Sequence, residues 1–378
     1  MLLKIKNWCK REPVLLIALL LAVVSAFFVP PDRGYLGYVD FRTLAILFCL
    51  MAVMAALQQS GVFKLLAEKL LLKVHHIRLA VFILVMLCFF GSMLITNDVA
   101  LITFVPFTLI VLGMLFEDGG KQLAVPLVVM QTIAANLGSM LTPIGNPQNL
   151  YLYGCAGMGL GNFIGLMLPY TLLSFALLAL WCGLFPYKGE KTIRFAPEKP
   201  AELTAGKGKM ALYCALFILS LLAVARVASY WLVLGITVLA MLLTDRKVLA
   251  KVDYSLLLTF VGFFIFIGNM GRVPAFSTLL ERIIAGNEVL TAVISSQVMS
   301  NVPAALLLSG FTHRYDLLLI GTNLGGLGTL IASMASLISF KQIARERKEL
   351  RGRFMVYFTL ANLLFLAALL LFWRGLQG

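Results

Sequence analysis

Hydrophobic residues occupy most of the chain in long runs, and short polar segments separate these runs. The runs recur from Pro13 to the C-terminus, and each is long enough to cross a hydrocarbon core about 30 Å thick at about 1.5 Å per residue. Uninterrupted runs are typical of transmembrane α-helices, whereas a membrane barrel alternates apolar and polar residues. The predicted full spans cover residues 14–29, 41–57, 122–156 (with an interruption), 163–185, 210–224, 228–244, 254–270, 317–340 and 354–373.

Two further hydrophobic stretches, residues 79–115 and 289–309, carry a polar turn and are predicted to fold as helical hairpins. In the second stretch neither arm can cross about 30 Å, so this hairpin is expected to re-enter the membrane. Its turn, Ser300-Asn301-Val302-Pro303, holds two residue types favoured at helix N-caps and a proline tolerated in a first helical turn. The second arm is therefore expected to present free N–H groups at membrane depth.

The first hairpin turns at Thr96-Asn97-Asp98. Its arms are long enough to span, so its re-entrance is inferred only from its correspondence to the second hairpin. Asp98 is the only carboxylate that the sequence places deep within either half, and an intramembrane carboxylate is a functional candidate by default. The alternative is that Asp98 caps the helix that follows, and both roles can hold together.

The run at residues 122–156 is interrupted by the segment "TPIGNPQN", which begins at Thr142. Its two prolines each remove a backbone donor and obstruct the preceding turn, and Gly145 frees the backbone. Irregular backbone at membrane depth survives only when it is buried in protein or lines a wet cavity. We therefore expect a discontinuous helix whose backbone groups, with Asn146, Gln148 and Asn149, face a ligand. The alternative is a proline kink or a loop between two shorter helices.

Three segments of the first half match the second half in the same order. The segment "VDFRTLAILFCLMAVMAALQQSGVF" from Val39 corresponds to "VDYSLLLTFVGFFIFIGNMGRVPAF" from Val252, and "LITNDVA" corresponds to "VMSNVPA". The segment "ANLGSMLTPIGNPQN" from Ala135 aligns without a gap with "TNLGGLGTLIASMAS" from Thr322. These matches predict two homologous repeats. An odd number of predicted crossings separates the repeat starts, so the second repeat is expected to be inverted, as in many secondary transporters.

The predicted fold is an all-α polytopic membrane protein with two inverted-topology repeats. Each repeat is expected to hold a re-entrant helical hairpin and a discontinuous transmembrane helix. The predicted divisions are an N-terminal transmembrane helix (1–38), the first repeat (39–186, with hairpin 79–115 and broken helix 122–156), a cytoplasmic linker (187–209) and the second repeat (210–378, with hairpin 289–309 and broken helix 317–340).

Composition and charge exclude several classes of protein. With 61% hydrophobic and 13% charged residues, the chain cannot cover a water-soluble surface. The net charge of +14 does not indicate nucleic acid binding, because the basic residues are spread among short loops. Their asymmetry predicts a multi-pass protein of a prokaryotic plasma membrane with a cytoplasmic N-terminus and an external C-terminus.

The sequence also lacks the signatures of an enzyme or a channel. The six cysteines have no metal-ligand spacing, so neither a disulfide framework nor a zinc site is expected. The sequence shows no HExxH motif, no P-loop, no catalytic serine-histidine constellation and no selectivity-filter signature. We therefore expect no catalysis and no cofactor, apart from a coupling ion.

The hairpin turns and the interrupted helix together resemble the ion transporter superfamily. This superfamily includes divalent anion/sodium symporters, citrate transporters, arsenite permeases and sodium/proton antiporters. The resemblance rests on "TND" and "SNVPA" at the turns and on "NLGSMLTPIGNPQN", and it spans about Phe41 to Phe340. It implies an elevator motion within a homodimer in the lipid bilayer. The motifs are specific for the superfamily but do not choose a substrate.

In the dicarboxylate branch, each turn carries a Ser-Asn-Thr triplet that contacts substrate carboxylates and helps hold sodium, beside an unwound Gly-Thr-Pro-Pro-Asn segment. The substrate-binding residues that the resemblance implies are Thr96, Asn97, Asp98, Asn146, Pro147, Asn149, Ser300, Asn301 and Ser333. The residues that it implies at two sodium sites are Ser92, Asn97, Gly145, Ser296, Asn301 and Ala332. The chain departs from the pattern where Asp98 and Val302 replace the third member of each triplet.

Neutral hydroxyl and amide groups with helix N-termini suit carboxylates, and carbonyls at half-helix ends suit Na⁺. The sequence therefore favours a secondary transporter of a small anion, a di- or tricarboxylate, coupled to a sodium or proton gradient. The alternative is a sodium/proton antiporter or arsenite efflux permease of the same fold, in which Asp98 titrates. The arsenite and antiporter branches usually carry aspartate at this position. Asn146, however, stands where such antiporters often have aspartate, which disfavours proton exchange.

Overall fold

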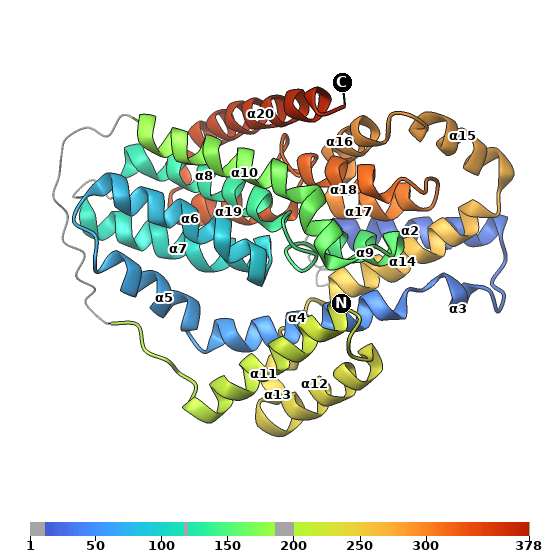
Figure 1. Ribbon diagram of the computed structural model, residues 1–378, viewed down its shortest axis with the longest axis horizontal. Helices are drawn as coiled ribbons and strands as arrows, with labels where there is room; N and C mark the ends of the chain where they lie inside the picture. Colours follow the sequence, from blue (N-terminus) through green and yellow to red (C-terminus); the bar gives the residue numbers. More distant parts are fainter. Residues whose placement is uncertain (1–11, 117–119, 186–199, 378) are drawn as a thin grey trace.

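The chain folds as a set of packed helices (Figure 1). The computed structural model describes residues 12–116, 120–185 and 200–377, and the regular structure within these ranges is helical throughout. Eight helices in the described ranges are long and apolar enough to cross a membrane. The protein is therefore an all-helical, multi-pass membrane protein, as the hydropathy pattern predicts.

The helices follow the predicted hydrophobic runs closely. Those of the first half are α2 (Pro13–Phe28), α3 (Tyr35–Tyr38), α4 (Phe41–Gln59), α5 (Val62–Leu71), α6 (Ile77–Ile95), α7 (Asn97–Leu115), α8 (Lys121–Ser139), α9 (Pro147–Ala156) and α10 (Leu160–Leu184). Those of the second half are α11 (Lys207–Val224), α12 (Tyr230–Thr244), α13 (Arg246–Leu249), α14 (Tyr254–Gly271), α15 (Pro274–Ile284), α16 (Glu288–Met299), α17 (Asn301–Ser309), α18 (Tyr315–Leu324), α19 (Met334–Glu346), the 3-10 turn η1 (Lys348–Leu350) and α20 (Arg351–Gly375).

Two series of helices, α4 to α10 and α14 to α20, present the same order of elements. Each series begins with a long apolar helix whose first turn is capped by an aspartate. Asp40 accepts a hydrogen bond from the Thr43 amide at 3.0 Å, and Asp253 accepts one from the Leu256 amide at 2.9 Å. Each series continues with a short amphipathic helix, a pair of packed helices, an interrupted helix and a final helix of 25 residues.

The interrupted helices connect the two ends of the molecule. In Figure 1, α6, α7 and α8 lie toward one end of the long axis, and α16, α17 and α18 lie toward the other. Helix α9 packs against α17 and α18, whereas α19 packs against α7 and α8. Each interrupted helix therefore starts among the helices of its own series and ends among those of the other, which brings the two interruptions to the middle of the molecule.

Some parts of the fold were not predicted. The amphipathic helices α5 and α15 have only 10 and 11 residues, so neither meets the length criterion for a span. The predicted linker extends too far at its C-terminal end, because Lys207 to Lys209 form the first turn of α11. Residues 187–199 of that linker lie outside the described residues. Gln131 bonds between helices, since its Nε2 donates to the Leu84 carbonyl at 3.0 Å and to Thr108 at 2.8 Å.

Close packing at a glycine joins the first helical pair to α8. A Cβ atom on Gly138 would overlap the Phe89 carbonyl and lie 2.7 Å from the Ser92 hydroxyl oxygen. The aligned glycine of the second half, Gly325, would place a Cβ 2.6 Å from the Ser296 hydroxyl oxygen. Any side chain at these positions therefore pushes the helical pair away from the interrupted helix.

We predict that Gly138→Ala lowers the free energy of unfolding by about 1–3 kcal/mol, because the backbone of α6 cannot move aside cheaply. The matched control is Gly165→Ala in α10, where a Cβ meets nothing within 4 Å. Thermal unfolding of the purified protein in detergent, followed by tryptophan fluorescence, measures the difference. Equal melting temperatures for the two variants would contradict the packing described.

Candidate functional site

The turns of the two helical pairs adopt the same unusual backbone conformation. Thr96 has φ 69° and ψ 153°, and Ser300 has φ 77° and ψ 154°. Positive φ is strained for residues other than glycine and costs on the order of 1–3 kcal/mol, so surrounding contacts must hold it in place. In both turns the next residue, Asn97 or Asn301, begins a new helix. The two turns are thus built alike, although they share only the asparagine.

Each turn is held against the interruption that follows it in the same series. The Asn97 backbone N–H donates to the Gly145 carbonyl at 3.2 Å, and the Asn301 backbone N–H donates to the Ala332 carbonyl at 3.0 Å. The gapless alignment of the two halves pairs Gly145 with Ala332. These hydrogen bonds satisfy one free donor of each helix N-terminus and one carbonyl of each irregular segment.

Two aligned asparagines connect the interruptions to each other. The Asn136 side chain accepts hydrogen bonds from Asn97 at 3.1 Å and from the Ser333 hydroxyl at 3.0 Å, and it donates to the Gly326 carbonyl at 3.4 Å. Its counterpart Asn323 donates to the Asn149 side chain at 2.7 Å. Both interruptions and the first turn therefore meet at a single buried site.

The first interruption is stabilised by side chains from α9. The Asn146 amide donates to the Ser139 hydroxyl at 2.6 Å, and the Asn149 amide donates to the carbonyls of Ser139 and Thr142, both at 3.2 Å. Because the Ser139 and Thr142 carbonyls have lost their helical partners, the Asn149 amide replaces the missing helical donors. Pro147 fills the first position of α9, where a backbone donor is not needed.

The second interruption is held by a different residue. The Gln297 side chain, from α16, donates to the carbonyls of Gly325 at 3.0 Å and Leu327 at 2.9 Å, and it accepts from the Thr329 amide at 2.8 Å. The serines aligned with Asn146 and Asn149 have shorter side chains, so the second half uses the helical pair instead. Sequence analysis missed Gln297, because the aligned residue of the first half is Met93 and the match gave no polar signal.

The alternative role for Asp98 as a helix cap is wrong. Thr96 occupies the cap position of α7, and its hydroxyl accepts from the Val99 amide at 3.5 Å. Asp98 lies one residue inside the helix, and its own amide donates to the Asn97 side chain at 2.9 Å. One oxygen of the Asp98 carboxyl is buried without a hydrogen-bond partner. The carboxyl is thus beside the turn but is not used to build it.

The serines predicted at the sodium sites, Ser92 and Ser296, lie against the aligned glycines Gly138 and Gly325. The Ser92 hydroxyl donates to the Phe89 carbonyl at 2.9 Å, and the Ser296 hydroxyl donates to the Ala292 carbonyl at 2.7 Å. Each donates within its own helix, so its oxygen lone pairs remain available. At the second turn, the Ser300 hydroxyl contacts only the Asn301 side chain, at 3.4 Å.

Several polar atoms near the interruptions are buried without partners. They include the amide nitrogen and oxygen of the Gln148 side chain, the hydroxyl of Ser336 and the side-chain oxygen of Asn323. Leaving such a group unpaired costs about 1–3 kcal/mol, so an unpaired cluster at one site needs an explanation. The sequence predicted that Gln148, with Asn146 and Asn149, faces a ligand, but the family resemblance does not include it among the substrate-binding residues. In the sequence, only the polar character of Gln148 within an apolar run pointed to this residue.

The helix ends give the site its electrostatic character. Helices α7, α9, α17 and α19 begin there, and α6, α8, α16 and α18 end there. Helix N-termini carry partial positive charge and free N–H groups, while C-termini carry free carbonyls. In the described ranges, no group of three or more His, Cys, Asp or Glu side chains is placed to hold a metal ion. The polar groups that the site offers are backbone and side-chain oxygens and amides, with the Asp98 carboxyl beside the first turn.

Comparison with known proteins identifies the family. The family model for citrate transporters matches residues 2–313. The inner membrane protein YbiR of Escherichia coli is 33% identical over 350 residues, which cover 90% of this chain and 89% of YbiR. An uncharacterized transporter of Methanocaldococcus jannaschii is 35% identical over 308 residues, covering 80% and 81% of the two chains. The magnetosome protein MamN of Magnetospirillum gryphiswaldense is 25% identical over 300 residues, covering 74% and 66%. The chain belongs to the citrate transporter family and is a membrane transporter, not an enzyme.

Proposed function

We propose that the protein is a secondary active transporter of a small di- or tricarboxylate, coupled to a sodium or proton gradient. The observation that carries the proposal is the convergence of four helix N-termini, those of α7, α9, α17 and α19, on one buried site. Each N-terminus acts as roughly half a positive charge, so together they attract an anion without any basic side chain. The side-chain amide of Asn301 and the second N–H of the Asn97 amide add neutral donors suited to carboxylate oxygens.

The coupling ion is proposed to bind beside the same turns, at the carbonyls of the two irregular segments. The carbonyls of Gly145 and Ala332 each accept one N–H group and keep a second lone pair, which Na⁺ could use. The hydroxyl oxygens of Ser92 and Ser296 and the side chains of Asn97 and Asn301 complete the two proposed sodium sites. Because cation and anion sites share the same turns, binding of one ligand favours binding of the other.

We propose that the two series of helices are inverted repeats and that both helical pairs re-enter the membrane. The matched backbone angles at Thr96 and Ser300, and the matched hydrogen bonds at Gly145 and Ala332, support a common origin. Helices α16 and α17 have 12 and 9 residues, which is too few to cross about 30 Å.

Alternating access is proposed to follow from an elevator motion within a homodimer. The part that moves is proposed to be the two helical pairs with the interrupted helices, because hydrogen bonds join them into one unit. The amphipathic helices α5 and α15 connect this unit to α4 and α14. Each lies in the chain between a long helix and a helical pair, where it is proposed to link the moving unit to the static helices and to accommodate the motion between them.

Uptake of labelled citrate and succinate into proteoliposomes tests the proposal. We predict uptake that depends on an imposed sodium or proton gradient and that saturates with substrate. Asn301→Ala removes a donor to a charged ligand and is expected to lower kcat/KM roughly 10- to 100-fold. Asn362→Ala is the control, because Asn362 donates only to Phe358 in its own helix. An absence of flux with either anion under every gradient would refute the proposal.

Gln148 provides a test that separates function from stability. Its side chain is fully buried with both polar atoms unpaired, so Gln148→Leu is expected to leave stability unchanged or to raise it. If the unpaired amide serves the substrate, the same variant raises the KM for uptake about tenfold. Gln131→Leu is the matched control, because Gln131 bonds to Leu84 and Thr108 and its loss lowers the melting temperature. An unchanged KM in Gln148→Leu would exclude the residue from the site.

A second function is supported by Asp98 alone. A carboxyl with one buried, unpaired oxygen can take up a proton when it releases a cation, as a sodium/proton antiporter or an arsenite permease would require. Adding Na⁺ or Li⁺ to weakly buffered protein and recording the pH distinguishes the two functions. The symporter predicts no proton release that depends on Asp98. Release in the wild type that disappears in Asp98→Asn would favour the antiporter.

A further inference from the structure

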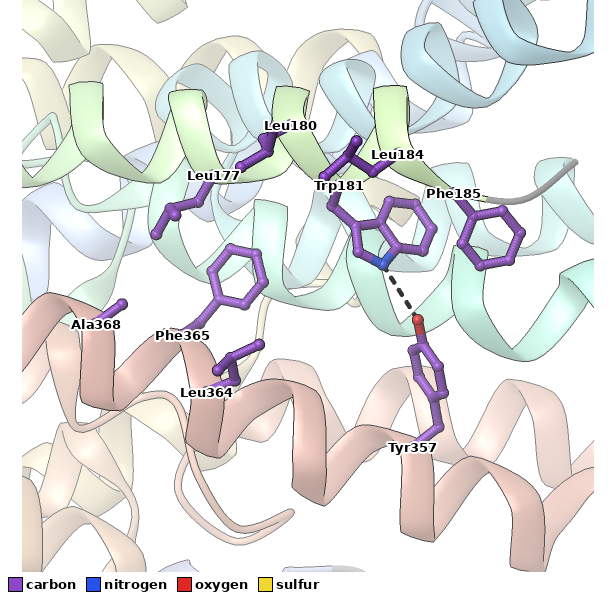
Figure 2. Close-up of a pocket in the computed structure, with 9 residues that line it drawn as sticks. All are labelled: Leu177, Leu180, Trp181, Leu184, Phe185, Tyr357, Leu364, Phe365 and Ala368. Carbon is purple, nitrogen blue, oxygen red and sulfur yellow. Dashed lines mark hydrogen bonds between the residues drawn. The ribbon is translucent and has the colours of Figure 1, made fainter.

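An apolar cavity lies between α10 and α20, outside the candidate site (Figure 2). It has a volume of about 450 Å³, within the range of roughly 300–1,000 Å³ typical of ligand pockets. Leu177, Leu180 and Leu184 line it from α10, and Leu364, Phe365 and Ala368 line it from α20. Several of these leucines are highly exposed, Leu184 by 73% and Leu364 by 70%, so the cavity opens as a groove toward the surroundings of the helices.

The groove has one polar end. There the Trp181 indole donates to the Tyr357 hydroxyl at 3.1 Å, as the dashed line in Figure 2 marks. Because Tyr357 accepts this hydrogen bond, its own proton remains available for another acceptor. Tryptophan and tyrosine gather where the hydrocarbon core meets the lipid head groups. The aromatic pair therefore places this end of the groove at a membrane surface.

The length of the groove matches one leaflet of a bilayer. From Tyr357 to Ala368, α20 rises about 16 Å at about 1.5 Å per residue. A hydrocarbon core is about 30 Å thick, so one leaflet contributes about half of that depth. A groove that begins at the aromatic pair and runs inward for this distance accommodates one extended acyl chain.

Cationic side chains precede the polar end of the groove along α20 and the turn before it. Arg353 lies one helical turn before Tyr357 on the same face of α20, and Arg351 and Lys348 precede it. All three are exposed. Arg353 uses one nitrogen to donate to the Gln122 carbonyl at 3.1 Å, and Arg351 uses one to donate to the Ala344 carbonyl at 2.8 Å. The remaining guanidinium donors can bind a phosphate, and the N-terminus of α20 adds partial positive charge.

We propose that this groove binds an anionic phospholipid. One acyl chain fills the space between α10 and α20, Tyr357 donates to the phosphate or an ester oxygen, and Arg353 pairs with the phosphate. The exposed side chains of Lys348, Arg351 and Arg353 favour an occupant with an anionic head group, and a second copy of the chain is an outcome that the test distinguishes. Helices α10 and α20 both pack against α8, so the lipid braces the helix that carries the first interruption.

The experiment compares two lipids with identical acyl chains. Palmitoyl-oleoyl phosphatidylglycerol or phosphatidylcholine is added to delipidated protein in neutral detergent, and thermal unfolding and native mass spectrometry are recorded. We predict that the anionic lipid raises the melting temperature by at least about 3 °C more than the zwitterionic lipid, and that one molecule stays bound.

Substitutions in and around the groove test whether the stabilisation by the anionic lipid arises there. Ala368→Trp and Leu364→Trp fill the groove and are expected to abolish the preference for the anionic lipid. Leu363→Trp, at an exposed leucine on another face of α20, is expected to keep it. Arg353→Gln is expected to reduce the shift to the phosphatidylcholine level, while Arg374→Gln at the other end of α20 does not.

Three results would overturn the proposal. The first is an equal shift with both lipids in the wild type. The second is an anionic preference that survives both groove-filling variants. The third is a dimer, seen by native mass spectrometry without added lipid, that Leu364→Trp converts to monomers, since this would assign the groove to a second copy of the chain.

Discussion

A backbone group without a hydrogen-bond partner costs several kcal/mol in hydrocarbon, and this constraint governs the architecture of the protein. Eight helix ends meet within the helical core, and each exposes amides or carbonyls that no helix satisfies. The turns and the interruptions satisfy part of each other's hydrogen bonding, because the backbone N–H groups of Asn97 and Asn301 donate to the carbonyls of Gly145 and Ala332. The broken backbone is therefore stable only while the two helical pairs remain docked against the interrupted helices.

The two halves meet the same requirement with different side chains. In the first half, Asn146 and Asn149 reach back to Ser139 and Thr142, and in the second half Gln297 reaches across from the helical pair. The first interruption is thus held mainly by Asn146 and Asn149 at the start of α9, and the second is held mainly by Gln297 of α16. The second helical pair and its interruption are consequently the more firmly joined unit.

Hydropathy and the positions of helix-breaking residues predicted the helices well. The length of an apolar run and its proline or glycine breaks can both be read from a single segment of the sequence. The interruption at "TPIGNPQN" and the turns at Asn97 and Asn301 were predicted for this reason. The hydrogen-bond partners of those residues were not predicted. Gln297, Gln148 and the crossed contacts of Asn136 and Asn323 depend on which helices become neighbours. The amphipathic helices α5 and α15 were missed because they are too short for a span and lie between stronger signals.

The central claim is that two interrupted helices and two turns enclose one site for a carboxylate. A cryo-EM map of the protein in lipid nanodiscs at saturating citrate and sodium tests it most directly. The account predicts ligand density between the turns at Asn97 and Asn301, within hydrogen-bond distance of the first turns of α7 and α17. Ligand density elsewhere, or continuous helices through residues 140–146 and 325–333, would contradict it.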